Sequence, residues 1–365
     1  MGKIPIGETV ELNPDKLNLS RRRFGEYLGL LAVGSISLSR MVTKVAGEEP
    51  EGEPLVQVRG IDGEPKRVVM VHPERKRRID KINDLNTKEI TENHEDVQRI
   101  KTIQLGEEED VERIGLEFII KESASYSIED EIEDDVGDLP VRFTYAPKLD
   151  ADVHVDEVDT VGGDDISIIG GHTCNAVSLH NDGDYELTLI GPAHALPTNE
   201  YGAHVNNEDE EHIATVREWD YDVDSYAAEL EVDAFDYNPD PYETVAQLPN
   251  IDGFWTVSGV QNELSGPGSI LCESYGRTEG YRTNHALEYH STFNHWAGSV
   301  HQIEFSIQTS EDGDSGSPWM EYEEPYLVAG HVGLMENSNN DDVDRATVAY
   351  PYYEDIDAIR TGGTK

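Results

Sequence analysis

Short runs of alternating hydrophobic and polar residues fill the chain from residue 162 onward, and Gly, Asn, Asp and Pro separate them. Alternation with a period of two places the hydrophobic side chains on one face of a β-strand. The clearest runs are residues 185–190, 213–216, 254–260, 269–273, 300–307 and 326–332. Regularly spaced short strands with turn residues between them predict an all-β sandwich or barrel over residues 162–365.

Residues 48–161 show a different pattern, because they are dense in charge. A basic run lies at 73–78 and an acidic run at 107–110, while alternating segments occur at 114–121 and 141–145. This pattern predicts a few strands and one helix. We interpret the segment as a charge-rich pro-region or accessory segment, either α+β or partly disordered, that precedes the β-rich domain.

Residues 1–47 carry features of an export signal. Ser-Arg-Arg-Arg-Phe at 20–24 precedes a mildly hydrophobic stretch at 27–38, and the small residues Ala46 and Gly47 follow. The pattern resembles a twin-arginine signal, which a translocase reads in order to export folded proteins. The hydrophobic stretch is about 12 residues long, too short for a bilayer core of roughly 30 Å. We expect transient contact with the twin-arginine translocase and a secreted, extracellular protein, free or associated with the cell surface. An amphipathic N-terminal helix is the alternative.

The charge of the chain restricts its partners and its environment. Its 365 residues include 75 Asp and Glu against 28 Lys and Arg, which gives a formal net charge of −47. Phosphate binding depends on Lys and Arg, so we expect no nucleic-acid partner. A charge of this size repels itself at low ionic strength, which indicates an organism that screens it with salt, a haloarchaeon. An ordinary acidic protein is the alternative.

The cysteine content excludes a disulfide framework. Only Cys174 and Cys272 occur, and 37% of the residues are hydrophobic. The stability of the fold must therefore come from a buried core. Whether the two cysteines form one bridge stays open at this point.

Three segments carry residue types suited to nucleophilic catalysis. The most specific is Gly-Asp-Ser-Gly-Ser-Pro at 313–318, where the glycines beside Ser315 allow a tight turn that presents a serine hydroxyl. His194 follows a predicted strand, and a base at a strand end could take the serine proton. A carboxylate between them in sequence could orient the imidazole. The candidates for it are Asp220, Asp222 and Asp224.

Together with Gly-Arg-Thr-Glu-Gly at 276–280, these segments resemble the chymotrypsin-like serine peptidases, especially the secreted microbial branch of streptogrisins and glutamyl endopeptidases. The resemblance implies two antiparallel Greek-key β-barrels, with His194 and Asp224 from the first and Ser315 from the second. His194 would be the general base, Asp224 the orienting carboxylate and Ser315 the nucleophile. The backbone N–H groups of Gly313 and Ser315 would form the oxyanion hole.

The likeness covers residues 162–353 and includes two departures from the family pattern. Gly-Pro-Ala-His-Ala surrounds His194 where the family usually has Thr-Ala-Ala-His-Cys, so the usual neighbouring disulfide is absent. Ser317 replaces the commoner Gly, a change also seen in glutamyl endopeptidases. Among the three aspartates we favour Asp224, because its offset to Leu230 matches the family.

The resemblance also suggests a specificity pocket lined by residues 326–333. Thr309 would lie near its floor, and a neutral side chain there does not supply the buried carboxylate that selects Arg or Lys. His331 could contact an acidic substrate side chain, as the glutamyl endopeptidases arrange. A shift of one residue would turn it away from the pocket and leave an ordinary strand histidine.

Two metal sites are weaker alternatives, and we expect neither a metal nor a cofactor. Four acidic residues match the ligand positions of an EF-hand loop, but Ser225 stands where that loop needs Gly. These residues are Asp220, Asp222, Asp224 and Glu231. Four histidines close in sequence share no face of a helix, which argues against zinc. They are His285, His290, His295 and His301.

The sequence therefore predicts a secreted, monomeric serine endopeptidase that cleaves polypeptide substrates through an acyl-enzyme intermediate. Residues 162–365 would form the peptidase domain. A catalytically silent module of the same fold, used for binding or inhibition, is the main alternative. A salt-adapted acidic surface protein without activity is a third hypothesis, which the clustered motifs argue against.

Overall fold

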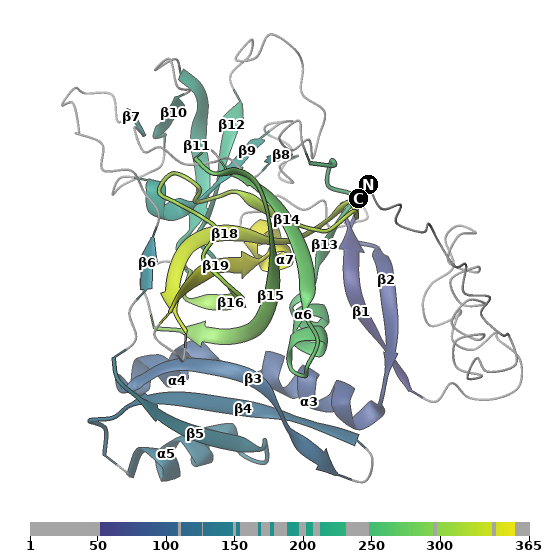
Figure 1. The fold of residues 1–365 in the computed structure, drawn as a ribbon, viewed down its shortest axis with the longest axis vertical. Coiled ribbons are helices and arrows are strands. Elements are labelled where there is room, and N and C mark those ends of the chain that lie inside the picture. Colours follow the sequence, from purple (N-terminus) through teal and green to yellow (C-terminus); the bar gives the residue numbers. More distant parts are fainter. Residues whose placement is uncertain are drawn as a thin grey trace, which may run out of the picture. The chain divides into compact units, whose positions relative to one another are not determined.

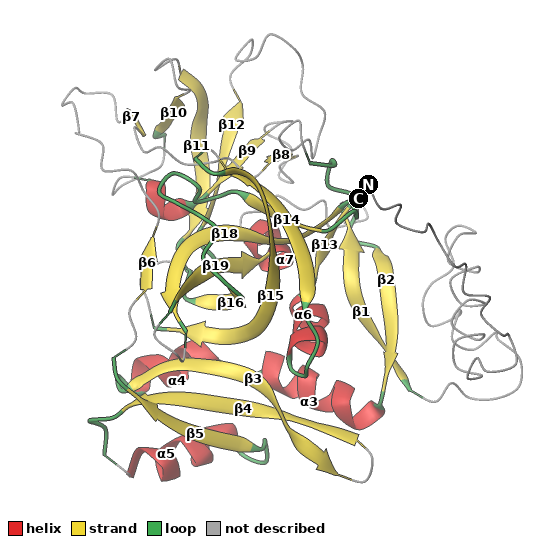
Figure 2. Cartoon of the chain, viewed as in Figure 1, coloured by secondary structure: helices red, strands yellow, loops and turns green. Residues whose placement is uncertain are grey.

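The computed structural model describes residues 52–354, apart from 109–110, 126, 149–150, 154–166, 169–175, 179–187, 197–201, 207–211, 231–247, 277, 295–297 and 338–340. Strands predominate among the described residues, and the helices are few and short, as Figure 2 shows in yellow and red. The predicted β-rich fold class is confirmed. The predicted export signal at 1–47 and Cys174 lie outside the described residues.

The first half of the predicted β domain contains a six-stranded sheet in the order β7-β10-β11-β12-β9-β8. Its strands are β7 (Ser167–Ile168), β8 (Ala176–Ser178), β9 (Thr188–Gly191), β10 (His204–Asn206), β11 (His212–Asp220) and β12 (Ser225–Leu230). The pairing of β10 with β7 is parallel, and the other described pairings are antiparallel. Because Gly191 pairs with Tyr226, the residues after β9 and those before β12 meet at one end of the sheet.

The second half closes into a barrel. Six antiparallel strands pair in a ring, β18 with β17, β17 with β14, β14 with β15, β15 with β16, β16 with β19, and β19 with β18. They are β14 (Ile270–Gly276), β15 (Gly280–Phe293), β16 (Val300–Phe305), β17 (Pro318–Glu321), β18 (Tyr326–Glu336) and β19 (Asp342–Val348). Figure 1 shows β15, β16, β18 and β19 curling around a common interior. Inside it, Trp319 stacks on Phe305 with ring centroids 4.5 Å apart.

The hydrophobic run at 254–260 is a strand only at its start, so the strand prediction there was wrong beyond Trp255. Strand β13 covers Gly253–Trp255, and helix α6 covers Val257–Leu264. The Thr256 Oγ1 atom accepts a hydrogen bond from the backbone N–H of Gly259 at 3.0 Å, which caps the helix. A short hydrophobic run does not distinguish a buried strand from a buried helix.

Residues 53–146 add strands to the same large sheet. Their elements are β1 (Glu53–Gly60), β2 (Pro65–Val71), α3 (Pro73–Asn83), α4 (Thr87–Asn93), β3 (Val97–Glu108), β4 (Val111–Lys121), α5 (Ser127–Val136) and β5 (Val141–Ala146). Strand β1 pairs with β13, and β3 pairs with the end of β15. Ile79, Phe118 and Ile132 belong to a hydrophobic core formed by this segment itself. The described residues of the segment form three helices where one was expected.

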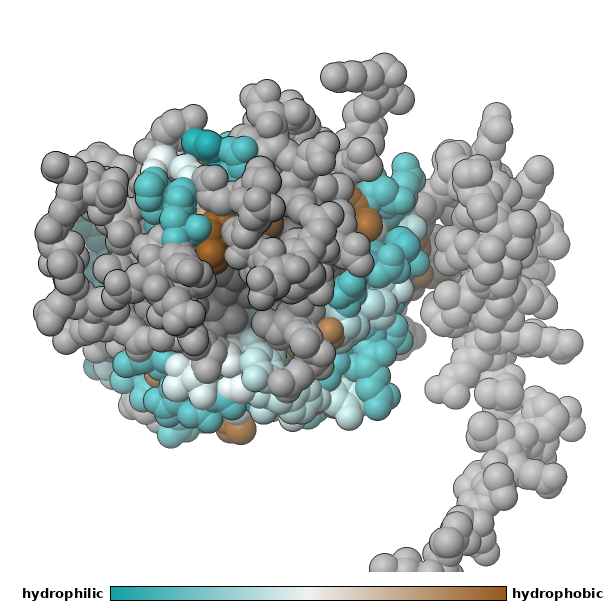
Figure 3. All heavy atoms as spheres, turned by 90° about the horizontal axis from the view of Figure 1, so that it is seen from above, coloured by the Kyte–Doolittle hydropathy of each residue, from teal (hydrophilic) through white to brown (hydrophobic). Residues whose placement is uncertain are grey.

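Two small elements complete the described fold. Strand β6 (Ala151–Val153) pairs with β18, and helix α7 (Ala349–Glu354) follows β19. The described residues that Figure 3 shows in colour are mostly hydrophilic, and the hydrophobic ones among them form small separate patches. Among the described residues, no helix has both the length and the hydrophobicity needed to cross a membrane.

Candidate active site

His194 lies within hydrogen-bonding distance of both Asp224 and Ser315. The Nδ1 atom of His194 is 2.7 Å from Asp224 Oδ2, and its Nε2 atom is 3.0 Å from Ser315 Oγ. His194 lies in the 3₁₀ helix η2 (Ala193–Ala195) after β9, Asp224 ends the turn between β11 and β12, and Ser315 precedes β17. All three residues are buried. The structure thus brings together one residue from each of the three segments that the sequence singled out.

Among the three candidate aspartates, Asp224 is the one that contacts His194. Its Oδ1 atom accepts the backbone N–H of His194 at 2.8 Å, while its Oδ2 atom faces the ring. Its φ of +54° is in the left-handed region, which Asp adopts more readily than most residues. Asp220 instead accepts the backbone N–H of Asp222 at 2.7 Å, and Asp222 binds Lys88. The carboxylates of Asp220, Asp222 and Asp224, which would be calcium ligands in an EF-hand loop, thus already bind groups of the protein.

The Ser315 hydroxyl has two acceptors within reach. Its Oγ atom is 3.0 Å from His194 Nε2 and 2.9 Å from the carbonyl oxygen of Val332. A hydroxyl carries one proton, so the two acceptors compete for it. When the His194 Nδ1–H points at Asp224, the Nε2 lone pair can accept this proton, which is the arrangement that general-base catalysis requires.

The loop that carries Ser315 needs glycine at two positions. Gly313 has a φ of +91° and Gly316 a φ of +85°, values that side chains with a Cβ rarely adopt. The backbone N–H of Gly316 donates to the carbonyl oxygen of His331 at 2.8 Å. The turn is therefore held against β18. The oxyanion-hole role of the Gly313 and Ser315 backbone N–H groups stays a prediction.

A buried ion pair, which the sequence did not reveal, anchors the same loop. The Asp314 carboxylate is fully buried and lies 2.5 Å from Arg282 Nη1. It also accepts the backbone N–H of Thr278 at 2.8 Å, which joins Thr278 to the loop that carries Ser315. Arg282 donates to Ser317 Oγ at 2.7 Å, and its guanidinium lies 5.0 Å from the Trp319 ring centroid. Each charge therefore has a hydrogen-bonded partner, as burial requires.

Thr309, predicted to lie near a pocket floor, is hydrogen-bonded to a buried carboxylate, that of Asp344. Its backbone N–H and its Oγ1 both donate to Asp344 Oδ2, at 3.0 and 2.5 Å. Asn284 donates to the same oxygen at 3.0 Å, and the Ser310 hydroxyl donates to Oδ1. Asp344 lies on β19 and is fully buried. This carboxylate holds the 309–310 backbone in place, and no local pattern distinguished it from the other acidic residues.

His331, the other predicted pocket residue, is fully buried on β18. Its Nδ1 atom accepts the indole N–H of Trp319 at 3.4 Å, and the two rings meet edge to face. Its backbone N–H donates to the carbonyl oxygen of Ser317 at 3.0 Å. The described contacts of His331 therefore tie β18 to the serine loop. Contact between His331 and a substrate stays a prediction.

His290 belongs to a buried charged cluster between the barrel and β3. The ligand atoms of Glu288, His290 and Glu304 lie within 4.8 Å of one another, close enough to share a metal ion. However, Lys101 Nζ contacts Glu288 and lies 4.0 Å from Glu304 Oε2, and Arg99 lies equally near Glu304. Two cations already neutralise these carboxylates and would repel a third positive charge. Burial lowers the pKa of His290 well below its usual value, so its ring adds no positive charge to the cluster.

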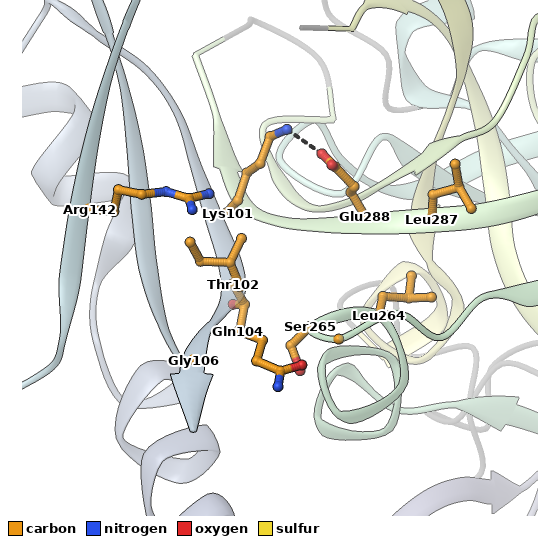
Figure 4. A pocket seen from close by; sticks show the side chains of 11 residues that line it. Lys101, Thr102, Gln104, Gly106, Arg142, Leu264, Ser265, Leu287 and Glu288 are labelled. Atoms are coloured by element: carbon orange, nitrogen blue, oxygen red, sulfur yellow. Dashed lines mark hydrogen bonds and ion pairs between the residues drawn. The ribbon is translucent and has the colours of Figure 1, made fainter. Parts of the chain in front are cut away.

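A cavity of about 390 Å³ borders this cluster, between β3, β15 and α6. Figure 4 shows Lys101 of β3 pointing toward Glu288 of β15, with Arg142 on the far side of Lys101. Arg142 donates to Glu117 at 2.9 Å. Both cations at the cavity are therefore paired with carboxylates, and the cavity does not form part of the site around Ser315.

The remaining histidines have separate partners. His285 Nδ1 is 3.3 Å from Ser269 Oγ, and His301 Nδ1 is 2.7 Å from the Tyr289 hydroxyl oxygen. His295 lies outside the described residues. The histidines that the structure describes in this part of the chain therefore do not converge on one site.

The pH dependence of stability should include a contribution from His301. Burial lowers the pKa of His301 from 6.5 to about 4. Between these values the unfolded chain binds a proton that the folded chain does not, so the free energy of unfolding falls as the pH drops through this window. We expect His301→Asn to lose less stability than the parent protein between pH 7 and pH 5, by roughly 1–2 kcal/mol.

This expectation can be checked by denaturant unfolding at both pH values in the same salt. Asn tolerates the positive φ at this position, and its side-chain amide can donate a hydrogen bond to the Tyr289 hydroxyl or accept one from it. An equal loss of stability in both proteins would contradict the assignment.

The comparisons with known proteins found similar solved structures. No protein-family model and no curated protein sequence matches the chain. Thermobifida fusca Protease A is 16% identical over 52% of this chain and 95% of its own, with a TM-score of 0.36. Cellulomonas bogoriensis chymotrypsin is 15% identical over 52% of this chain and 94% of its own, with a TM-score of 0.31. A glutamic acid specific serine protease is 12% identical over 49% of this chain and 92% of its own, with a TM-score of 0.32. The similar solved structures thus include serine proteases.

Proposed function

We propose that this protein is a serine endopeptidase in which Ser315 is the nucleophile, His194 the general base and Asp224 the carboxylate that orients the imidazole. The observation that carries the proposal is the continuous chain of contacts from Asp224 Oδ2 to His194 Nδ1 at 2.7 Å and from His194 Nε2 to Ser315 Oγ at 3.0 Å. These atoms come from segments far apart in sequence, and such a meeting of the three residue types is typical of acyl transfer.

The proposed reaction uses only groups of the protein and water. His194 removes the proton of Ser315 while Oγ attacks the peptide carbonyl carbon, and Asp224 stabilises the imidazolium that forms. The backbone N–H groups of Gly313 and Ser315 would bind the oxyanion. His194 then gives its proton to the leaving amine, and a water molecule, activated by the same base, releases the acyl group from Ser315.

We further propose that the enzyme is exported and acts in high salt as a monomer. Support for export comes from the arginines of residues 20–24 ahead of a short hydrophobic stretch. Support for salt adaptation comes from the net charge of −47. A translocase that carries folded proteins would let so acidic a chain fold before it leaves the cell.

One contact favours the second candidate, a silent module of the same fold. Because the Val332 carbonyl oxygen is 2.9 Å from Ser315 Oγ, it can hold the hydroxyl proton and keep the serine from His194. A protein trapped in that state would bind polypeptides without cleaving them.

A fluorophosphonate probe distinguishes the two functions, because it reacts with a serine only when a general base activates its hydroxyl. We expect the full chain, folded in high salt, to be labelled and Ser315→Ala to remain unlabelled. Ser269→Ala is a matched control, since Ser269 also contacts a histidine, His285, but at an exposed site outside the candidate active site. Absence of Ser315-dependent labelling in folded protein would rule out the peptidase and favour the silent module.

A further inference from the structure

The turn that supplies Asp224 concentrates negative charge in an unusual backbone conformation. Asp220, Asp222 and Asp224 fall within five residues, and Asp224 has a φ of +54°. Like charges repel, and a left-handed non-glycine residue needs support from its surroundings. The position of the Asp224 carboxylate therefore depends on what holds this turn.

One support comes from the barrel, through the loop between β15 and β16. The backbone N–H of Gly298 donates to the carbonyl oxygen of Tyr221 at 2.8 Å, and that of Val300 donates to the carbonyl oxygen of Asp222 at 3.1 Å. The Ser299 hydroxyl donates to Asp222 Oδ1 at 3.2 Å. Three hydrogen bonds thus fix one side of the turn.

The other support comes from α4, which belongs to the segment that precedes the β domain. Thr87, its first residue, accepts a buried hydrogen bond from Thr292 of β15 at 2.5 Å, which docks the helix on the barrel. The next residue, Lys88, places its Nζ atom 2.5 Å from Asp222 Oδ2. The hydrogen bond to Asp222 raises the pKa of Lys88, so the ammonium stays charged.

We propose that Lys88 is a positioning residue that neutralises and fixes the 220–224 turn, and that the 53–146 segment is thereby part of the working enzyme. This inference rests on the proposed function, since it concerns the same Asp224. Ser299 holds Oδ1 of Asp222 and Lys88 holds Oδ2, so the two contacts lock the carboxylate and with it the turn that ends at Asp224. Lys88 itself touches neither His194 nor Ser315 in the described contacts and would act through Asp222.

The test compares peptide hydrolysis by Lys88→Ala, Lys88→Arg and Asp222→Asn with that of the parent protein, at the lowest salt in which all are folded. We expect Lys88→Ala to lower kcat about three- to fivefold with KM nearly unchanged, because a half-exposed ion pair contributes only modestly. Lys88→Arg should restore kcat, because it returns the charge and the hydrogen bond. Asp222→Asn should lower kcat by a similar factor. The double variant Lys88→Ala with Asp222→Asn should have a kcat no lower than that of either single variant.

Lys66→Ala is the matched control, because Lys66 also joins this segment to the β domain. Its Nζ atom lies 3.1 Å from Asp252 Oδ1, and the two pairs are similarly exposed. Lys66→Ala should change kcat little. Equal losses of kcat in Lys66→Ala and Lys88→Ala at equal loss of stability would reduce Lys88 to an ordinary structural contact and overturn the inference.

The two proposals fail in different ways. If Ser315→Ala is inactive while Lys88→Ala keeps the full kcat, the inference about Lys88 is overturned and the peptidase stands. If the parent protein has no Ser315-dependent hydrolysis, both are overturned.

Discussion

Asp224→Asn is expected to lower kcat by about 10⁴-fold while leaving the fold intact. The reason lies in how the two carboxylate oxygens are used. Oδ1 accepts the backbone N–H of His194 at 2.8 Å, so an asparagine must turn its oxygen toward that donor and its NH₂ group toward the ring. The ring nitrogen Nδ1 then has to accept a hydrogen bond, which puts the proton on Nε2. In that tautomer Nε2 cannot take the proton of Ser315.

Steady-state hydrolysis of a peptide substrate, together with a thermal melt, would check this expectation. Asp220→Asn is the informative comparison, because its amide oxygen can still accept the backbone N–H of Asp222. It should cost at most a few-fold in kcat. A larger loss in Asp220→Asn than in Asp224→Asn would mean that the wrong carboxylate has been assigned to the triad.

Arg282→Gln is expected to lower the free energy of unfolding by about 3–5 kcal/mol, the usual cost of leaving a buried charge without its partner. Asp314 is fully buried, and Arg282 supplies its nearest donor at 2.5 Å. The substitution also removes the hydrogen bond to Ser317 and the stacking on Trp319. Because Asp314 directly precedes Ser315, the proposed nucleophile, activity should fall together with stability.

Denaturant unfolding of three further variants separates charge from packing. Arg282→Lys should lose less stability than Arg282→Gln, because it keeps the charge. The double variant Arg282→Gln with Asp314→Asn should be more stable than Arg282→Gln alone, since no charge is left unpaired. Arg217→Gln breaks the partly exposed pair with Glu229 and should cost at most about 1 kcal/mol. If Arg282→Gln and Arg217→Gln lowered the free energy of unfolding equally, burial would not be what makes the Arg282–Asp314 pair costly to break.

The β domain and its candidate site could be predicted because their signals are local. The runs predicted as strands at 300–307 and 326–332 coincide with β16 (Val300–Phe305) and β18 (Tyr326–Glu336), which bury most of their residues rather than one face alone. The serine turn needs glycine at 313 and 316 to reach positive φ, which leaves a recognisable pattern in the sequence. His194 and Asp224 stood out through their order and their place beside strands, although the choice among three aspartates depended on resemblance to a family.

The preceding segment was harder to predict because charge obscures its helices. Helix α3, Pro-Glu-Arg-Lys-Arg-Arg-Ile-Asp-Lys-Ile-Asn, buries Ile79 and Ile82 but otherwise reads as a charged run. A usable signal existed for α4, where Asn86 caps the helix and also donates to Glu89, three residues on. It was overlooked.

The structural partners of the site had no local signal at all. Arg282 and Asp314 are 32 residues apart, and Thr309 and Asp344 are 35 apart. Asp314 and Asp344 are two among 75 acidic residues, and nothing in the sequence around them indicates which residue each one binds. Only the packing of the barrel decides which few acidic side chains lose their water and acquire a fixed partner.

The pairing of β3 with β15 covers an edge of the barrel that would be open if the barrel existed without the preceding segment. Along one edge, β15 pairs with β14 through Ala286 and then with β3 from His290 to Phe293. Cleavage that released β3 would bare the backbone N–H and C=O groups of this second stretch, and an open strand edge recruits strands from other molecules. The leading segment thus protects the barrel from self-association, so a chain shortened to the barrel alone would need another cover for that edge.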